Sequence, residues 1–138
     1  MVRRPKLVRL LPRLCRLMTW TLSRPCSRTN YVNHQVSAAA PTPPPGAHHK
    51  QLTVDFFTAR LHGLPDLKVS SERMVATDDQ VAASFVYEGT QRGVLLGVAP
   101  SGKHMRFTSC DIFRIANGKI AEHWGMGDIA GQLAQMKS

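Results

Sequence analysis

The spacing of apolar residues predicts one long helix in the middle of the chain. Between Lys50 and Gly63, apolar side chains recur at roughly helical intervals, and Gly63 followed by Pro65 is typical of a helix end. These apolar positions are Leu52, Phe56, Ala59 and Leu61. Upstream, the stretch from Tyr31 to Lys50 contains three consecutive prolines before Gly46, which predicts a loop of polyproline character.

Beyond Pro65 the apolar period falls to two, which is typical of strands with one buried face. The predicted strands span residues 67–71, 75–76, 81–87, 104–115 and 119–126. Residues 77–79 have the composition of a turn, and Asn117-Gly118 is the strongest short hairpin signal in the chain. Residues 129–136 then have the pattern of a short closing helix.

These elements predict an α+β fold whose sheet lies between Asp66 and Asp128. One helix ahead of about four antiparallel strands, three of them long, favours a curved antiparallel sheet wrapped around helices. Helices packed on the concave face of such a sheet leave an internal pocket, where a small molecule can bind.

Length and charge narrow the possible function classes. The chain has 138 residues, enough for one domain, and no apolar run long enough to span a bilayer. Residues 1–54 hold nine Lys or Arg and no carboxylate, whereas residues 55–138 hold nine residues of each sign. A nucleic-acid groove would place its surplus of basic residues on the folded body. Because the body is neutral, we expect neither a nucleic-acid nor a membrane partner.

The cysteines carry little functional information. Cys15, Cys26 and Cys110 lack the spacing of a metal site, and their number is odd. We expect Cys110 to be a small buried residue within a strand. A reduced, cytoplasmic setting without a structural metal fits this usage.

Several segments, taken in order, resemble the SnoaL-like polyketide cyclase, or ester cyclase, family. They are Tyr31-Val32-Asn33-His34, residues 63–67, residues 97–103, Phe107-Thr108, Asp111-Ile112-Phe113-Arg114-Ile115, Asn117-Gly118-Lys119-Ile120, Glu122-His123-Trp124 and Asp128. The resemblance covers residues 31 to about 135 and implies a domain at 31–138. The implied fold is the cone with an internal pocket of the nuclear transport factor two-like superfamily. It also implies a homodimer formed through the convex face of the sheet.

The resemblance implies cofactor-free acid–base chemistry on a small hydrophobic carbonyl compound. The best-known members of the family close an anthracycline-type polyketide ester by an intramolecular aldol reaction. Related isomerisations or hydrolyses are possible on the same fold. The alternative is a non-catalytic ligand-binding or dimerisation module, since one fold hosts many functions. In catalytic relatives an acidic residue closely follows the Trp of this motif, whereas this chain has Gly125 and Met126 there.

Three residues are candidates for acid–base catalysis, each with a structural alternative. Asp111 lies by parity on the same strand face as Phe107, Ser109, Phe113 and Ile115. A carboxylate in these surroundings suits proton transfer, or else ties strands together through hydrogen bonds. His34 would relay protons near the pocket entrance, or be a surface histidine. Asp128 is the third candidate, or the N-cap of the helix that follows it.

The predicted pocket has an aromatic wall. Its residues are Phe56, Phe85, Phe107, Phe113 and Trp124. His123 and Trp124 are neighbours on one strand, so only one of them can face the pocket. Because Trp124 is the larger apolar body, we expect it to face inward and His123 to lie on the opposite face. Parity also places Arg114 on the face opposite Asp111.

Residues 1–30 form an atypical basic segment, where relatives carry an acidic amphipathic helix ahead of Tyr31. The segment superficially resembles a mitochondrial presequence, and a basic arm for anionic surfaces is a second explanation. A third is a shifted reading frame over about residues 10–29. Read from the last base of each codon, Met18–Thr29 admits Asp-Leu-Asp-Ala-Val-Glu-Ala-Val-Phe-Ala-Asp, which resembles the missing helix.

The shifted-frame hypothesis predicts that resequencing the gene will restore an acidic helix ahead of Tyr31. The basic charge of the segment would then have no functional meaning. An intact frame, confirmed by mass spectrometry of a cellular peptide spanning Cys26 to Tyr31, would contradict the hypothesis and leave the presequence and the basic arm.

Overall fold

A computed structural model describes residues 27–35 and 42–138, which form two helices and one five-stranded sheet. The strands are β1 (Ser27–Asn33), β2 (Lys68–Ala76), β3 (Gln80–Thr90), β4 (His104–Ala116) and β5 (Lys119–Gly127). The helices are α2 (His49–Gly63) and α3 (Ile129–Lys137). The predictions for the basic segment fall almost wholly on residues 1–26, outside the described part of the chain.

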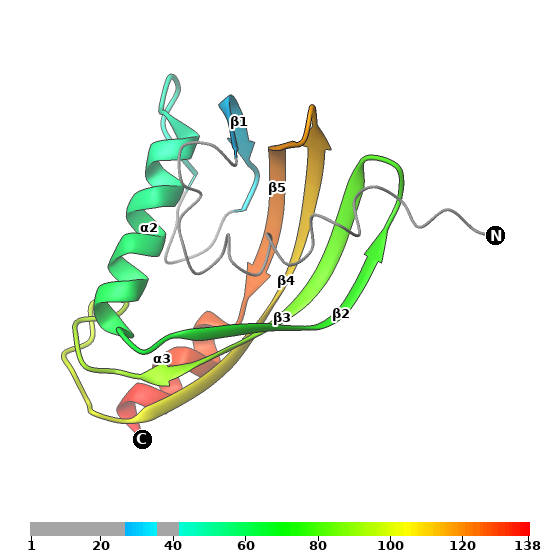
Figure 1. Cartoon of the computed structure of the whole chain (residues 1–138). Helices are drawn as coiled ribbons and strands as arrows, with labels where there is room; N and C mark the ends of the chain where they lie inside the picture. Colours follow the sequence, from blue (N-terminus) through cyan, green and yellow to red (C-terminus); the bar gives the residue numbers. More distant parts are fainter. Residues whose placement is uncertain (1–26, 36–41) are drawn as a thin grey trace.

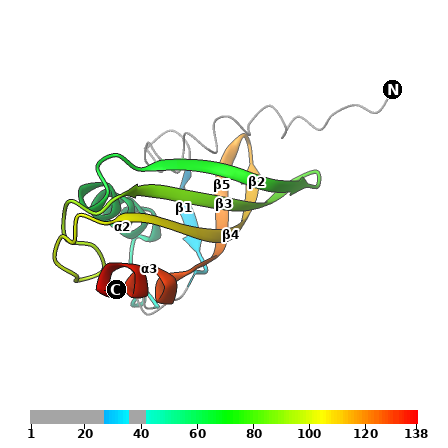
Figure 2. The same cartoon turned by 90° about the horizontal axis from the view of Figure 1, so that it is seen from below.

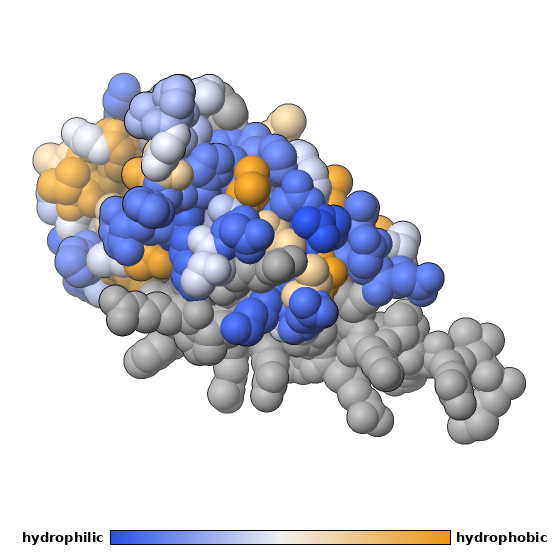
Figure 3. Space-filling model, turned by 90° about the horizontal axis from the view of Figure 1, so that it is seen from above, coloured by the Kyte–Doolittle hydropathy of each residue, from blue (hydrophilic) through white to orange (hydrophobic). Residues whose placement is uncertain are grey.

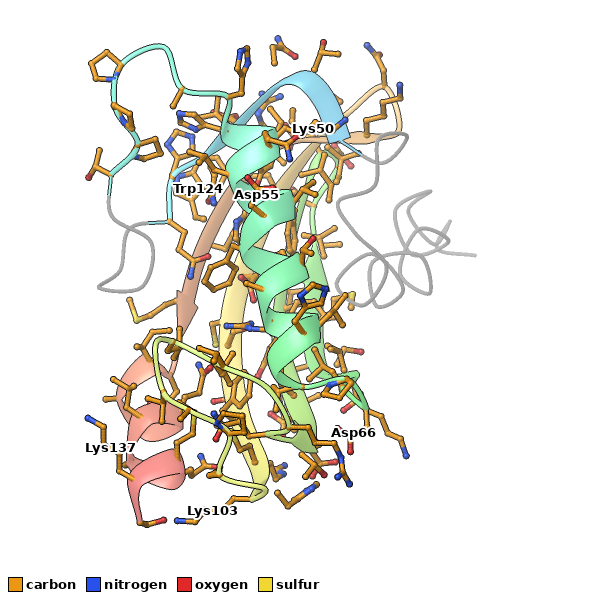
Figure 4. All side chains as sticks on the ribbon, turned by 90° about the vertical axis from the view of Figure 1, so that its left-hand side faces the viewer. Lys50, Asp55, Asp66, Lys103, Trp124 and Lys137 are labelled. Atoms are coloured by element: carbon orange, nitrogen blue, oxygen red, sulfur yellow. The ribbon has the colours of Figure 1, made fainter. Side chains whose placement is uncertain are left out.

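The sheet has the strand order β1-β5-β4-β3-β2, and it curves around α2, which lies along its concave side (Figure 1). Lys50 in the first turn of α2 and Asp66 just past its last turn mark the two ends of this helix (Figure 4). The shorter α3 packs against β4 (Figure 2). This arrangement confirms the predicted α+β class, with a curved sheet wrapped around helices. The sheet is open rather than closed into a barrel.

The strand β1 is the main departure from the predicted fold. The prediction of a loop from Tyr31 is wrong for residues 31–33, which complete β1. This strand runs parallel to β5, with Asn33 opposite His123, and the backbone N–H of His34 donates to the His123 carbonyl at 2.8 Å. Since the partner strand lies about 90 residues away, the local apolar pattern gives no sign of the pairing. The sheet is therefore mixed rather than wholly antiparallel.

The two β-hairpins have their turns where the sequence predicts them. The segments 67–71 and 75–76 are joined into the single strand β2, and its turn to β3 is closed by the Thr77 N–H donating to the Gln80 carbonyl at 2.9 Å. Asn117 and Gly118 both have positive φ, 51° and 72°, as a tight β4–β5 hairpin requires. The predicted hairpin signal is confirmed.

From His104 to Phe113, the strand β4 alternates between exposed and buried side chains. Its buried positions are Met105, Phe107, Ser109, Asp111 and Phe113. The predicted parity is therefore confirmed for Asp111. It also explains why Cys110 is exposed, so the expectation of a buried cysteine is wrong. Arg114 lies on the other face of β4 from Asp111, as predicted, and its side chain donates a hydrogen bond to Glu122.

The strand β5 contains one extra residue, which changes the side chains that point to the concave face of the sheet. Ile115 pairs with Ile120, but the preceding residue of β4, Arg114, pairs with Glu122, so Ala121 has no partner of its own. Ile120 and Ala121 are consequently both buried. A bulge of one residue moves every later side chain to the other face. The residues of β5 that turn inward are therefore the odd-numbered ones.

The buried face of α2 is offset from the predicted apolar one. Its buried residues are Thr53, Phe57, Arg60 and Gly63. Leu52 is instead exposed, and Phe56 is partly buried. The helix thus turns a hydroxyl and a guanidinium toward the concave side of the sheet. Polar groups on a buried face cost free energy unless partners compensate them, so this face is where functional groups are to be sought.

Gln91 fixes the loop that follows β3. Its side chain is fully buried; Nε2 donates to the carbonyl oxygens of Gly93, Val98 and Ala99, and Oε1 accepts from the backbone and the hydroxyl of Ser101. Five hydrogen bonds from one side chain hold this loop in a single arrangement beside the end of α2. On the molecular surface, apolar residues form separate patches among polar ones (Figure 3). No helix among residues 27–35 and 42–138 is long and apolar enough to cross a membrane.

Candidate functional site

A buried carboxylate–imidazole pair lies on the concave face of the sheet. Asp111 on β4 and His123 on β5 are each only 4% exposed, and a hydrogen bond of 2.7 Å joins Asp111 Oδ1 to His123 Nε2. The bulge in β5 brings His123 to this face. The expectation that His123 faces outward and Trp124 inward is therefore wrong, because the strand is not regular between residues 120 and 122.

Small residues on both neighbouring strands make room for the pair. Asp111 pairs with Ala83 on β3 and with Gly125 on β5. A Cβ atom at Gly125 would lie 2.4 Å from Asp111 Oδ1 and 2.7 Å from His123 Nε2. Gly125 is thus the position that leaves space for this hydrogen bond.

The second carboxylate oxygen is bound as well. The hydroxyl of Ser109, two residues earlier on the same face, donates to Asp111 Oδ2 at 2.5 Å. The Ser109 oxygen is also 3.5 Å from the hydroxyl of Tyr87. Asp111 is therefore held on one side by Ser109 and on the other by His123, and its orientation is fixed.

The other imidazole nitrogen faces Asn33, the last residue of β1. His123 Nδ1 is 3.0 Å from Asn33 Oδ1, which also accepts from the backbone N–H of Gln35 at 3.0 Å. Because that N–H can only donate, the amide must present its oxygen here, while its Nδ2 donates to Thr53 Oγ1 at 3.3 Å. His123 accordingly carries a proton on Nδ1. A further proton lies between Nε2 and Asp111, as either an imidazolium with a carboxylate or a neutral pair.

A cavity of about 360 Å³ opens on this imidazole. Its walls come from the end of β1, the Pro-rich loop, the first half of α2 and β5. The lining residues are Asn33, Gln35, Thr42, Pro43, Pro44, His49, Leu52, Thr53, Phe56, Phe57 and His123. Asp111 does not line this cavity, so His123 stands between the carboxylate and the space that a ligand would occupy.

His49 is a second histidine on the cavity wall. Its Nδ1 accepts from the backbone N–H of Asn33 at 3.0 Å, which leaves the proton of the neutral ring on Nε2. His49 is the first residue of α2, and sequence pattern alone gives it no function. Asn33, Gln35 and His49 all depend on the pairing of β1 with β5, which explains why local patterns do not identify them.

Tyr31 lies just behind this network. Burial raises the pKa of Tyr31 to about 12, with the Thr53 hydroxyl opposing the shift and the negative charge of Asp111 adding to it. The Tyr31 hydroxyl has no partner in hydrogen-bond geometry among the described residues. The phenol therefore stays neutral over the physiological range and cannot serve as a base.

The predicted aromatic wall is only partly realised. Phe56 lines the cavity, and Phe57, which was not predicted, joins it. Three others are core residues instead: Phe85, Phe107 and Phe113. Phe113 does contribute indirectly, because its ring stacks on the imidazole of His123 with centroids 4.9 Å apart.

Trp124 and His34 lie together on the opposite, outer face of the sheet. Their rings stack at 4.6 Å, and His34 Nε2 is 3.1 Å from Glu122 Oε1. A hydrogen bond from Arg114 lowers the pKa of Glu122, and His34 lowers it further. The structure thus does not bring His34 together with Asp111. Trp124 lines an open outer depression instead of the internal cavity.

Asp128 caps α3. Its Oδ1 accepts from the backbone N–H of Gly131 at 2.8 Å, and the side chain is exposed. This is the structural alternative expected from the sequence, and it separates Asp128 from the buried pair. Within residues 27–35 and 42–138, no group of three His, Cys, Asp or Glu is arranged to hold a metal ion.

We predict that Gly125→Ala breaks the Asp111–His123 hydrogen bond. The added methyl group would overlap both side chains, so the free energy of unfolding should fall by about 1–3 kcal/mol, measured by urea denaturation. Gly127→Ala on the same strand is the matched control, since a Cβ there meets no atom within 4 Å. Equal stability of the two variants would contradict the predicted role of Gly125.

Comparison with known proteins agrees with this architecture. The model of the SnoaL-like polyketide cyclase family matches residues 19–136. Among solved structures, IdmH of Streptomyces antibioticus, a candidate polyketide cyclase, is 24% identical, with a TM-score of 0.80 over 96% of this chain and 99% of that one. AclR of Streptomyces galilaeus, a candidate hydroxylase, is 22% identical, with a TM-score of 0.76 over 94% and 80%.

A SnoaL-like polyketide cyclase from Agrobacterium tumefaciens is 16% identical, with a TM-score of 0.65 over 94% of each chain. At these identities the structural likeness shows the fold alone. No curated protein matches the sequence. The family model spans most of the chain, including every element of the site, and the chain therefore belongs to the SnoaL-like polyketide cyclase family.

Proposed function

We propose that this protein is a cofactor-free acid–base enzyme that acts on a hydrophobic carbonyl compound, as a cyclase or a related isomerase or hydrolase. The observation that carries the proposal is the buried Asp111–His123 pair with its imidazole on a cavity wall. Burying two ionisable groups costs free energy, and catalysis is a common reason for keeping them. In this proposal His123 moves the proton, and Asp111 is a positioning residue.

The proposed reaction begins when a substrate carbonyl displaces Asn33 from His123. Nδ1, which donates its proton to Asn33 in the free protein, first releases that proton to water. The neutral ring, whose remaining proton on Nε2 is held by Asp111, can then take a proton from the carbon next to the carbonyl, which leaves an enolate. The enolate carbon then forms a bond to a second carbonyl carbon of the same molecule. The oxygen of that carbonyl gains the electron pair and receives the proton back from Nδ1, so the product is an isomer of the substrate. Asp111 stabilises the imidazolium between these two steps.

The composition of the cavity wall supports the proposal of a flat, mostly apolar substrate. Leu52, Phe56, Phe57 and two prolines supply apolar wall, while the polar groups gather at the His123 end. Asn33 and Gln35 carry side-chain amides there, and a neutral His49 carries a proton on Nε2. Such donors can stabilise the negative oxygen of an enolate.

One observation favours the alternative of a binding module. Both nitrogens of His123 are already hydrogen-bonded, to Asn33 and to Asp111. If Asn33 is not displaced by a ligand, the imidazole only organises the wall, and the cavity would bind a small hydrophobic molecule without turnover.

Deuterium exchange tests the proposal without knowledge of the natural substrate. We expect the protein to speed deuterium uptake at the acidic carbons of 2-tetralone in D₂O, followed by NMR. His123→Gln should lower the rate by about 10²–10⁴-fold. Asp111→Asn should lower kcat while leaving KM little changed, as expected of a residue that acts through His123.

His34→Gln is the control, because His34 lies on the outer face. Saturable binding of 2-tetralone without faster exchange would favour the binding module. Exchange that persists undiminished in folded His123→Gln would overturn the proposed role of the imidazole.

We further propose that the homodimer implied by the resemblance forms through the outer face of the sheet. Three apolar side chains are exposed around the Trp124 depression: Val75, Ile112 and Met126. Met126, which is 78% exposed, should lie in the contact, so Met126→Glu should shift the mass measured by light scattering from dimer to monomer. Ala130→Glu on α3 is the control. A wild-type monomer at all concentrations would contradict this proposal.

A further inference from the structure

Arg60 is a buried cation for which the proposed chemistry at His123 has no use. It lies on the inward face of α2 and is 7% exposed. Its guanidinium carbon is within cation–π distance of four aromatic rings. The distances to the ring centroids are 4.8 Å for Phe56, 5.7 Å for Phe57, 5.2 Å for Tyr87 and 5.3 Å for Phe107.

Within the part of the chain that the structure describes, this guanidinium lacks the ionic partner that a buried cation normally has. Arg60 Nε has no hydrogen-bond partner among the described residues, and none of the ion pairs between them includes Arg60. An arginine stays charged at neutral pH, although burial lowers the pKa of Arg60, with Tyr87 and Asp111 opposing that shift. Aromatic faces offset part of the cost of burial but accept no N–H in the guanidinium plane. Nε, one of the planar donors of Arg60, is thus left without an acceptor among the described residues.

A small cavity of about 190 Å³ adjoins this side chain. Besides Arg60, it is lined by Phe56, Ala59, Val94, Leu95 and Leu96. Its loop side belongs to the segment that Gln91 holds in place, so this wall is formed before any ligand arrives. Phe56 also lines the larger cavity at His123, and therefore stands between the two spaces.

We propose that the cavity beside Arg60 is an anion subsite that takes the carboxylate, or an equally planar enolate, of a hydrophobic aromatic ligand. The planar fork of a guanidinium matches the two oxygens of such a group and binds them with two parallel hydrogen bonds. The rest of the wall is apolar or aromatic and suits a flat ring. A single arginine without a second cation is a poor match for a phosphate, whose higher charge needs more donors.

The position of Phe56 suggests how the two cavities work together. A ligand long enough to pass Phe56 could hold its acidic end at Arg60 while its carbonyl group lies at His123. The subsite itself needs no turnover, however, and stands whether His123 is catalytic or only organises the wall. The test is therefore a binding measurement.

Benzoate and benzamide form a matched pair of probes, because they have nearly the same shape and only benzoate is charged. We expect calorimetric titration of the full chain to give at least about tenfold tighter binding of benzoate, the ratio expected for a charge-assisted pair. Arg60→Met should remove this preference while leaving benzamide within about twofold. Arg60→Lys keeps the charge without the fork and should retain only part of the preference.

Two controls separate this site from its surroundings. Arg92→Met removes an exposed arginine of the neighbouring loop and should leave benzoate binding unchanged. His123→Gln should also leave it unchanged, which excludes binding of benzoate at the imidazole. Urea denaturation of Arg60→Met adds a structural readout, since replacing an unpaired buried cation with an apolar side chain of similar length should not lower stability.

The proposal fails if wild-type protein binds benzoate and benzamide equally, or binds neither. It also fails if folded Arg60→Met keeps the preference for benzoate. Loss of stability in Arg60→Met, together with equal binding of the two probes by the wild type, would assign Arg60 a purely structural role among the aromatic rings.

Discussion

The pairing of β4 with β5 depends on one extra residue, and the interior of the protein depends on that pairing. Ala121 has no partner on β4, so the side chains of β5 exchange faces at this point. His123 turns inward to Asp111, and Trp124 turns outward to His34. Without the bulge, the concave face would hold an indole beside a buried carboxylate that has no basic partner. The site is thus a consequence of strand register rather than of an unusual local conformation.

The same face contains more polar groups than an ordinary core. Thr53 and Arg60 from α2 face Ser109, Asp111 and His123 from the sheet. A helix optimised for stability would have apolar residues in place of Thr53 and Arg60, since burial of polar groups costs free energy unless partners compensate it. Polar groups at buried positions of this kind are common where ligands bind.

Local patterns predict most of the fold and half of the site. Alternation identified β4 and the inward side of Asp111, and Asn117-Gly118 marked the hairpin, because these features depend on neighbours in sequence. The strand β1 and the bulge depend on contacts between distant segments, which no apolar period records. For that reason the sequence placed Trp124 in the pocket and left His123 outside. Gly125 stands where the family resemblance leads one to expect a catalytic acid, although it is the residue that leaves space for the Asp111–His123 pair.

The position of β1 at the edge of the sheet has a consequence for dynamics. An edge strand that pairs with only one other strand of the sheet opens more readily than the central strands, by local fluctuations that leave the rest of the sheet intact. Each opening would withdraw Asn33 from His123 and free the Nδ1 edge of the ring, while Asp111 kept its hold on Nε2. Fraying of the strand would thus expose the imidazole without disturbing its anchor. The availability of His123 is then a property of the edge of the sheet, which ties the site to how firmly the first described segment is held.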